Sequence, residues 1–168
     1  MNLEARLRRR IKALTWIFII GLIMSGATAI PIRWEVDKLV EFLAPNTMGV
    51  QPLESLDPFT RMLCQIQDSF YAPAGKNRFL FYGTDWLAFG HFVIAFAFVG
   101  ALRDPVRNRW LFDFGLIACV LVIPYAMIFG EVRGIPFFWR LIDCSFGIIG
   151  FVPMWFCRKC VCELEQRT

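Results

Sequence analysis

The chain has 168 residues, of which 57% are hydrophobic and only 19% are charged, and its mean hydropathy is +0.53. A soluble domain of this length cannot bury so much apolar surface, which excludes a soluble monomer. The apolar, aromatic composition also excludes a disordered chain and a basic nucleic-acid binder, although the net charge is +4. We therefore expect an all-α integral membrane protein that contacts the lipid bilayer and binds no nucleic acid.

Four apolar runs predict a bundle of four transmembrane helices within a single membrane domain, residues 1–168. The expected spans cover about residues 13–32, 84–102, 110–130 and 136–157. At about 1.5 Å per residue, each run is long enough to cross a hydrocarbon layer of about 30 Å or to come close to doing so. Tryptophan favours the headgroup level, and all 6 Trp lie near the ends of these runs.

The first run allows two interpretations. Its basic start and the small residues Ala27, Thr28 and Ala29 imitate a cleaved signal peptide. We favour an uncleaved membrane anchor, because the apolar stretch is long for a signal sequence and Pro31 closely follows the cleavage-like residues. Cleavage remains the alternative.

The basic residues predict the orientation in the membrane. Most of the 18 Lys and Arg lie in the N-terminal segment, between the second and third spans, and in the C-terminal tail. Because cytoplasmic loops retain Lys and Arg, we expect both termini in the cytoplasm and the loop of about residues 33–81 outside.

The long loop carries the pattern of two short amphipathic helices. Val36, Leu39, Val40 and Leu43 recur at helical spacing, and Asp57 followed by Pro58 is a typical helix start. The second helix would present an apolar stripe of Phe59, Met62, Leu63, Ile66 and Phe70. We expect these external helices either to cover the bundle or to meet a protein partner or lipid headgroup, and a homo-oligomer is a further alternative.

Ionisable side chains near the external surface form the candidate functional site. An ionisable group in a span costs about 3 kcal/mol, so each needs a partner or a wet cavity. Arg140 and Asp143 are spaced to pair on one helix face, followed by Gly147 and Gly150, which predict close packing against another span, with Gly90 of the second span as a candidate contact. The candidate cluster comprises Asp85, His91, Glu131, Arg133, Arg140 and Asp143. We expect it to be either a packing device or a substrate or proton site.

The sequence favours neither a metal nor a cofactor. His91 is the only His, which excludes a bis-His haem site. Cys157, Cys160 and Cys162 lack the second half of a zinc motif. No phosphate-binding loop, nucleophile elbow or dinucleotide fingerprint is present.

Four phrases carry a family resemblance: YGTDWLAFGH from Tyr82, LRDPVRN from Leu102, IACVLVIP from Ile117 and RGIPFFWRLIDCSFG from Arg133. Through them the chain resembles an uncharacterised family of small bacterial four-helix integral membrane proteins. The resemblance implies the bacterial inner membrane and no known activity. More distantly, the order of Asp85, His91, Arg140, Asp143 and Gly147 is similar to that in VanZ-like proteins, although the spacing departs in both halves and the late Asn is absent.

We therefore expect a multi-pass bacterial inner-membrane protein, most simply a structural or accessory envelope protein. The alternative is a membrane-embedded enzyme or carrier that acts on a lipid or anionic headgroup through an outward-facing polar cluster. Arg133 and Arg140 would suit such a headgroup. The sequence leaves the question of enzymatic activity open and favours the accessory role.

Overall fold

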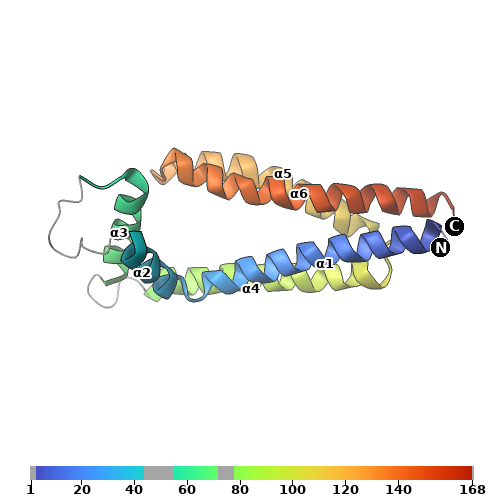
Figure 1. Ribbon diagram of the computed structural model, residues 1–168, viewed down its shortest axis with the longest axis horizontal. Helices are drawn as coiled ribbons and strands as arrows, with labels where there is room; N and C mark the ends of the chain where they lie inside the picture. The colour runs from blue at the N-terminus through green and yellow to red at the C-terminus, as the bar shows by residue number, and fades with distance from the viewer. Residues whose placement is uncertain (1–2, 44–54, 72–77, 168) are drawn as a thin grey trace. The chain divides into compact units, whose positions relative to one another are not determined.

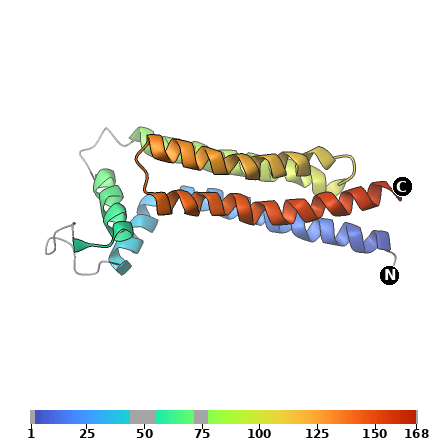
Figure 2. The same ribbon diagram turned by 90° about the horizontal axis from the view of Figure 1, so that it is seen from above.

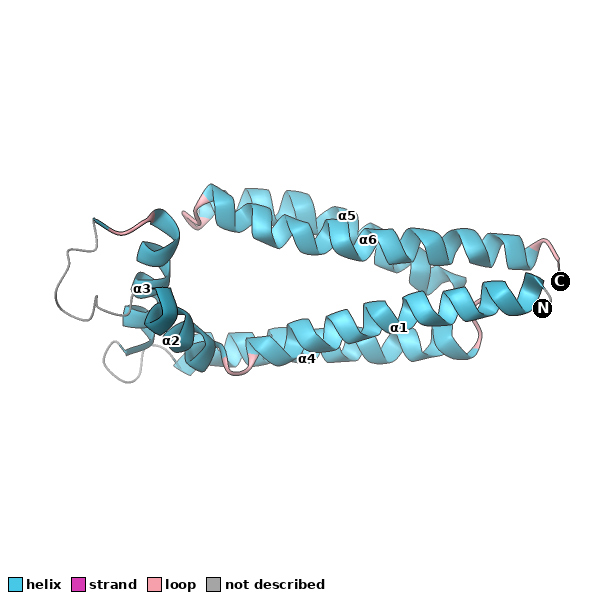
Figure 3. Ribbon diagram, viewed as in Figure 1, coloured by secondary structure: helices cyan, strands magenta, loops and turns pink. Residues whose placement is uncertain are grey.

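The computed structural model describes residues 3–43, 55–71 and 78–167, and within these ranges the chain forms helices and loops without a strand (Figure 3). The helices are α1 (Leu3–Ala29), α2 (Ile32–Leu43), α3 (Pro58–Tyr71), α4 (Arg78–Arg103), α5 (Arg109–Val132) and α6 (Phe137–Glu165). Four of them, α1, α4, α5 and α6, are long and apolar enough to cross a membrane. The expected all-α class with four long apolar helices is therefore confirmed. Parts of the predicted loop, residues 44–54 and 72–77, lie outside the described residues.

The long helices extend beyond the apolar runs. α1 begins at Leu3 rather than near residue 13, and α6 ends at Glu165 rather than near residue 157. In both extensions an apolar side chain recurs every third or fourth residue and is buried, as at Leu7 and Ile11 or at Val161 and Leu164. A hydropathy average over these charged segments misses the buried stripe, because the average ignores which face of the helix each residue occupies.

The chain divides into two compact units, which we describe separately. Unit 1 comprises Met1–Leu22 and Val93–Thr168, and unit 2 comprises Ile23–Phe92. The core of unit 1 draws residues from all four long helices, among them Ile11, Phe98, Phe112 and Met154, whose side chains are fully buried. Phe98 contacts both Phe18 and Phe112, with ring centroids 4.9 Å and 6.3 Å apart. The start of α1 and the end of α6, which are nearest to the chain termini, lie at the same end of this unit (Figure 1).

α5 and α6 form the main helix pair of unit 1 and run side by side (Figures 1 and 2). The residues that α6 buries are spaced alternately by three and four along its second half, as in a left-handed helical bundle: Met154, Cys157, Val161 and Leu164. α1 joins this pair through Thr15, which is fully buried and lies 3.7 Å from Cys157 Sγ. Thr15 Oγ1 donates to the carbonyl of Ile11 at 2.7 Å, so its polar group is satisfied inside the core.

In unit 2, α2 and α3 pack against each other as a hairpin. Val36 and Val40 of α2 are buried against Leu63, Cys64 and Phe70 of α3. The start of α3 follows the expectation, because Asp57 Oδ1 accepts the backbone N–H groups of Phe59 at 3.0 Å and Thr60 at 3.1 Å. The hairpin is therefore held by its own small apolar core.

The end of α1 and the first half of α4 approach closely in unit 2. The contact is at Gly26, where an added Cβ would lie 2.9 Å from the Phe92 ring, 3.0 Å from His91 Cβ and 3.1 Å from the Ala88 carbonyl oxygen. Any larger residue at position 26 would push the two helices apart. Gly26 thus lets α1 and α4 pack with their backbones close together.

Candidate functional site

The turn between α5 and α6 begins with a helix-ending motif that the local sequence specifies. Gly134 adopts a left-handed conformation, with φ +69°, which favours glycine. Its N–H donates to the Glu131 carbonyl at 3.0 Å, and the N–H of Ile135 donates to the Gly130 carbonyl at 2.8 Å. This is the hydrogen-bond pattern of a Schellman motif, and Pro136, two residues after Gly134, is the N-cap of α6.

Arg140 lies across this turn. Its Nε donates to the Ile135 carbonyl at 2.7 Å, and its Nη1 forms an ion pair with Glu131. The aliphatic stem lies on Gly130, where an added Cβ would be 2.7 Å from Arg140 Cγ. The side chain of Arg140 is 11% exposed, whereas that of Glu131 is 74% exposed. The guanidinium therefore closes the turn from the inside, with Glu131 as its outer partner.

The expected pairing of Arg140 with Asp143 is wrong, because Glu131 takes the place of Asp143. Side chains on a helix point toward its N-terminus, so Arg140 reaches back to the turn before α6, while Asp143 lies one turn further along. Asp143 is half-buried, and no described residue forms a hydrogen bond or ion pair with it. A packing role through Arg140 thus needs no contribution from Asp143.

The other candidate residues have looser surroundings. Arg133 is exposed at the C-terminus of α5, without an ion-pair partner among residues 3–43, 55–71 and 78–167. In unit 2, Asp85 is exposed on α4, and His91 Nδ1 lies 2.8 Å from the Leu87 carbonyl oxygen of its own helix. Because a carbonyl oxygen can only accept, Nδ1 is the donor in this hydrogen bond. The structure brings together Glu131 and Arg140; it gives no contact between Asp85 and His91.

The glycines of α6 do form a packing seam, but the neighbouring helix differs from the expected one. An added Cβ at Gly147 would lie 2.5 Å from the Cys119 carbonyl oxygen of α5, and one at Gly150 would lie 3.0 Å from Cys119 Sγ. Gly90 has no atom within 4 Å of the corresponding position. The short turn at Gly134 makes α5 the antiparallel neighbour of α6, which places α5 and not α4 against these glycines.

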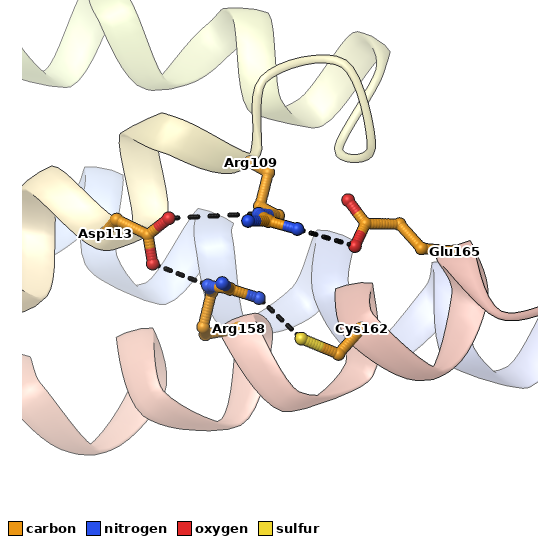
Figure 4. A network of polar contacts seen from close by, with 5 residues as sticks. All are labelled: Arg109, Asp113, Arg158, Cys162 and Glu165. Atoms are coloured by element: carbon orange, nitrogen blue, oxygen red, sulfur yellow. Dashed lines mark hydrogen bonds and ion pairs between the residues drawn. The ribbon is translucent and has the colours of Figure 1, made fainter.

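A second polar network, which the sequence reasoning missed, lies at the end of unit 1 that carries the termini (Figure 4). Arg109 Nη1 contacts Glu165 at 2.9 Å, and Arg158 Nε contacts Asp113 at 2.5 Å. Arg109 Nε also lies 3.9 Å from Asp113, and Arg158 contacts Cys162 Sγ. The i, i+4 spacing of Arg109 and Asp113 was the signal available in the sequence. The network ties the first turn of α5 to the last turns of α6.

The Arg140–Glu131 ion pair and the network of Figure 4 link α5 to α6, one at each end of the helix pair. Within the described part of the chain, no group of three or more His, Cys, Asp or Glu side chains is placed to hold a metal ion. What the arrangement does chemically is to neutralise charge between neighbouring helices.

No protein-family model, no curated protein and no solved structure matches this chain.

Proposed function

We propose that the chain is a multi-pass protein of the bacterial inner membrane that has a structural or accessory role in the cell envelope. Four long apolar helices support membrane embedding. The basic residues at the end that carries the termini favour a cytoplasmic location for both termini. The resemblance to the small bacterial four-helix family, and more distantly to VanZ-like proteins, is part of this proposal.

The observation that carries the accessory role is the environment of Arg140. Arg140 is one of the two arginines among the candidate residues, and it is 11% exposed and engaged by Glu131 and by the Ile135 carbonyl. A guanidinium that binds substrate must leave donors open to it. Arg140 instead uses its charge to close a turn, which is a packing function.

The test combines folding with function. In a strain that lacks the protein, the Arg140→Gln variant should reverse the deletion phenotype only to the extent that folded protein accumulates in the membrane. We use this reversal as the measure of function. Arg133→Gln, the matched control at an exposed Arg nearby, should restore function fully. A well-folded Arg140→Gln protein without function would contradict the accessory role, as would loss of function in a well-folded Arg133→Gln protein.

One observation favours the alternative of a membrane-embedded enzyme or carrier for a lipid or anionic headgroup. Asp143 is half-buried in α6 without a described partner, and such a group inside a membrane is often functional. If Asp143→Asn accumulates as a folded protein and still does not restore function, this alternative replaces the accessory role.

A further inference from the structure

α2 has a second apolar side that no described residue covers. Val36 and Val40 face α3, whereas Leu39, Phe42 and Leu43 lie beside this buried stripe and remain exposed, and we call these three residues the open face of α2. Phe42 is 80% exposed. Trp34 is also exposed, but at about 100° per residue it lies on the opposite side of α2 from Leu43, and Lys38 and Glu35 lie in the arc between them. The outer side of α3 is mainly polar and includes Gln65, Asp68 and Ser69. The second half of α2 therefore presents an exposed apolar surface, whereas the outer side of α3 is polar.

Polar contacts between α2 and α3 fix which side of α2 remains open. Asp37 accepts hydrogen bonds from Gln67 Nε2 at 2.9 Å and from the Tyr71 hydroxyl at 2.7 Å. The Arg33 guanidinium lies 4.2 Å from the centre of the Tyr71 ring. α2 therefore cannot rotate to bury its open face against α3 without losing these contacts.

The charges of α2 largely cancel one another. Lys38 Nζ lies 2.6 Å from Glu41, and the Arg33 charge acts on Asp37. Glu35 lies in the first turn, where the helix dipole favours a carboxylate. No strong basic patch remains to recruit an acidic partner, so whatever covers the open face must be recognised by its apolar character.

The chain itself restricts where the hairpin can lie. α2 begins at Ile32, three residues after α1 ends at Ala29, so its start is at most about 11 Å from the end of α1 (Figure 1). At the other end, Tyr71 of α3 and Arg78 of α4 are seven residues apart, which spans at most about 25 Å. Because α1 and α4 are both long enough to cross a membrane, the start of α2 is held close to the membrane surface, and the end of α3 lies within about 25 Å of the start of α4.

We propose that the open face of α2 lies in the headgroup and upper acyl region of the same bilayer, with phospholipid as its occupant. This inference rests on the proposed membrane embedding and adds a second, lateral mode of membrane contact. Trp34, on the opposite side of α2 from Leu43, then lies at the headgroup level rather than among the acyl chains, as membrane-interface tryptophans do. Leu39, Phe42 and Leu43 enter the acyl region, while the polar outer side of α3 remains in water.

The experiment uses the full chain in vesicles of phosphatidylcholine and phosphatidylglycerol. A photo-crosslinking p-benzoylphenylalanine replaces Phe42 in one protein and, as the matched control, Asp68 on the outer side of α3 in another. After irradiation, mass spectrometry should detect about tenfold more phospholipid adduct at position 42 than at position 68, because the ring at position 42 lies among acyl chains. Both positions are exposed, so neither replacement disturbs the hairpin core.

Equal lipid adduct at both positions would overturn the inference. A crosslink from position 42 to protein would also overturn it, whether to the same chain or to a second copy. Flotation of the same samples with the vesicles separates this inference from membrane embedding. A chain that floats without lipid adduct at position 42 contradicts only the lateral contact, whereas a chain that does not float contradicts the embedding as well.

Discussion

Replacing Gly147 by Ala tests the contact between α5 and α6 at its tightest point. The added Cβ would lie 2.5 Å from the Cys119 carbonyl oxygen and 2.5 Å from Val122 Cγ1. A backbone oxygen cannot rotate away, so the helices must separate, which costs up to about 3 kcal/mol. Alanine regains about 1 kcal/mol of helix propensity over glycine. The net expected loss of unfolding free energy is therefore up to about 2 kcal/mol.

The assay is unfolding of the purified protein in detergent, followed by tryptophan fluorescence. Gly90→Ala is the matched control, because no atom lies within 4 Å of its added Cβ, and it should be as stable as the unmodified protein or slightly more so. Gly150→Ala should fall between the two, since its closest contact is the Cys119 thiol, which can rotate. If Gly147→Ala unfolds at the same point as Gly90→Ala, the close packing of α6 on α5 is wrong.

Three further changes test separate parts of the structure. Asp143→Asn should leave thermal stability unchanged or raise it, because it removes an unpaired charge from a span; a lower melting temperature in detergent would show that Asp143 has a partner. Burial would raise the pKa of Asp37, but the hydrogen bonds from Gln67 and Tyr71 outweigh this effect and hold the pKa of the folded protein below 3.8. The stability that these bonds add is therefore present above pH 3.8 and is lost as the pH falls through the folded pKa. Tyr71→Phe should raise the Asp37 pKa in a carbon-13 NMR titration, and an unchanged titration would exclude this cause. Asn108→Ala should lower the unfolding free energy by about 1–2 kcal/mol, because Asn108 Nδ2 donates to the Gly100 carbonyl at 3.1 Å and to the Asp104 carbonyl at 3.0 Å. Chemical unfolding measures this loss, and the exposed control Arg107→Ala should show none.

Features set by local sequence could be predicted well. Long apolar runs require long helices whatever surrounds them, and the Asp57 cap depends only on backbone groups two and three residues further along. The apolar stripe of α2 was also readable, but its two sides were not distinguishable. Val40 is buried while Leu39 is exposed, and only the position of α3 decides between them.

Features that depend on the relative register of two helices were not accessible. Asp143 is closer to Arg140 in sequence than Glu131 is. Arg140 nevertheless pairs with Glu131, because the turn at Gly134 folds α5 back over α6. Arg109 and Glu165 meet although 56 positions separate them, since the pairing needs the full length of both helices in register. The polar residues in the sequence thus indicated where the turn between α5 and α6 lies, but they did not predict which side chains pair there.

The role of Arg140 is tested most directly by a double-mutant cycle on the unfolding free energy in detergent, with Glu131→Gln, Arg140→Gln and both changes together. The contact predicts a coupling of about 0.5–1 kcal/mol, kept small by the exposure of Glu131. Arg140→Gln should also cost more than Glu131→Gln, because it loses the bond to the Ile135 carbonyl as well. Strictly additive effects, together with an Arg140→Gln protein as stable as the unmodified chain, would contradict a packing role for this residue.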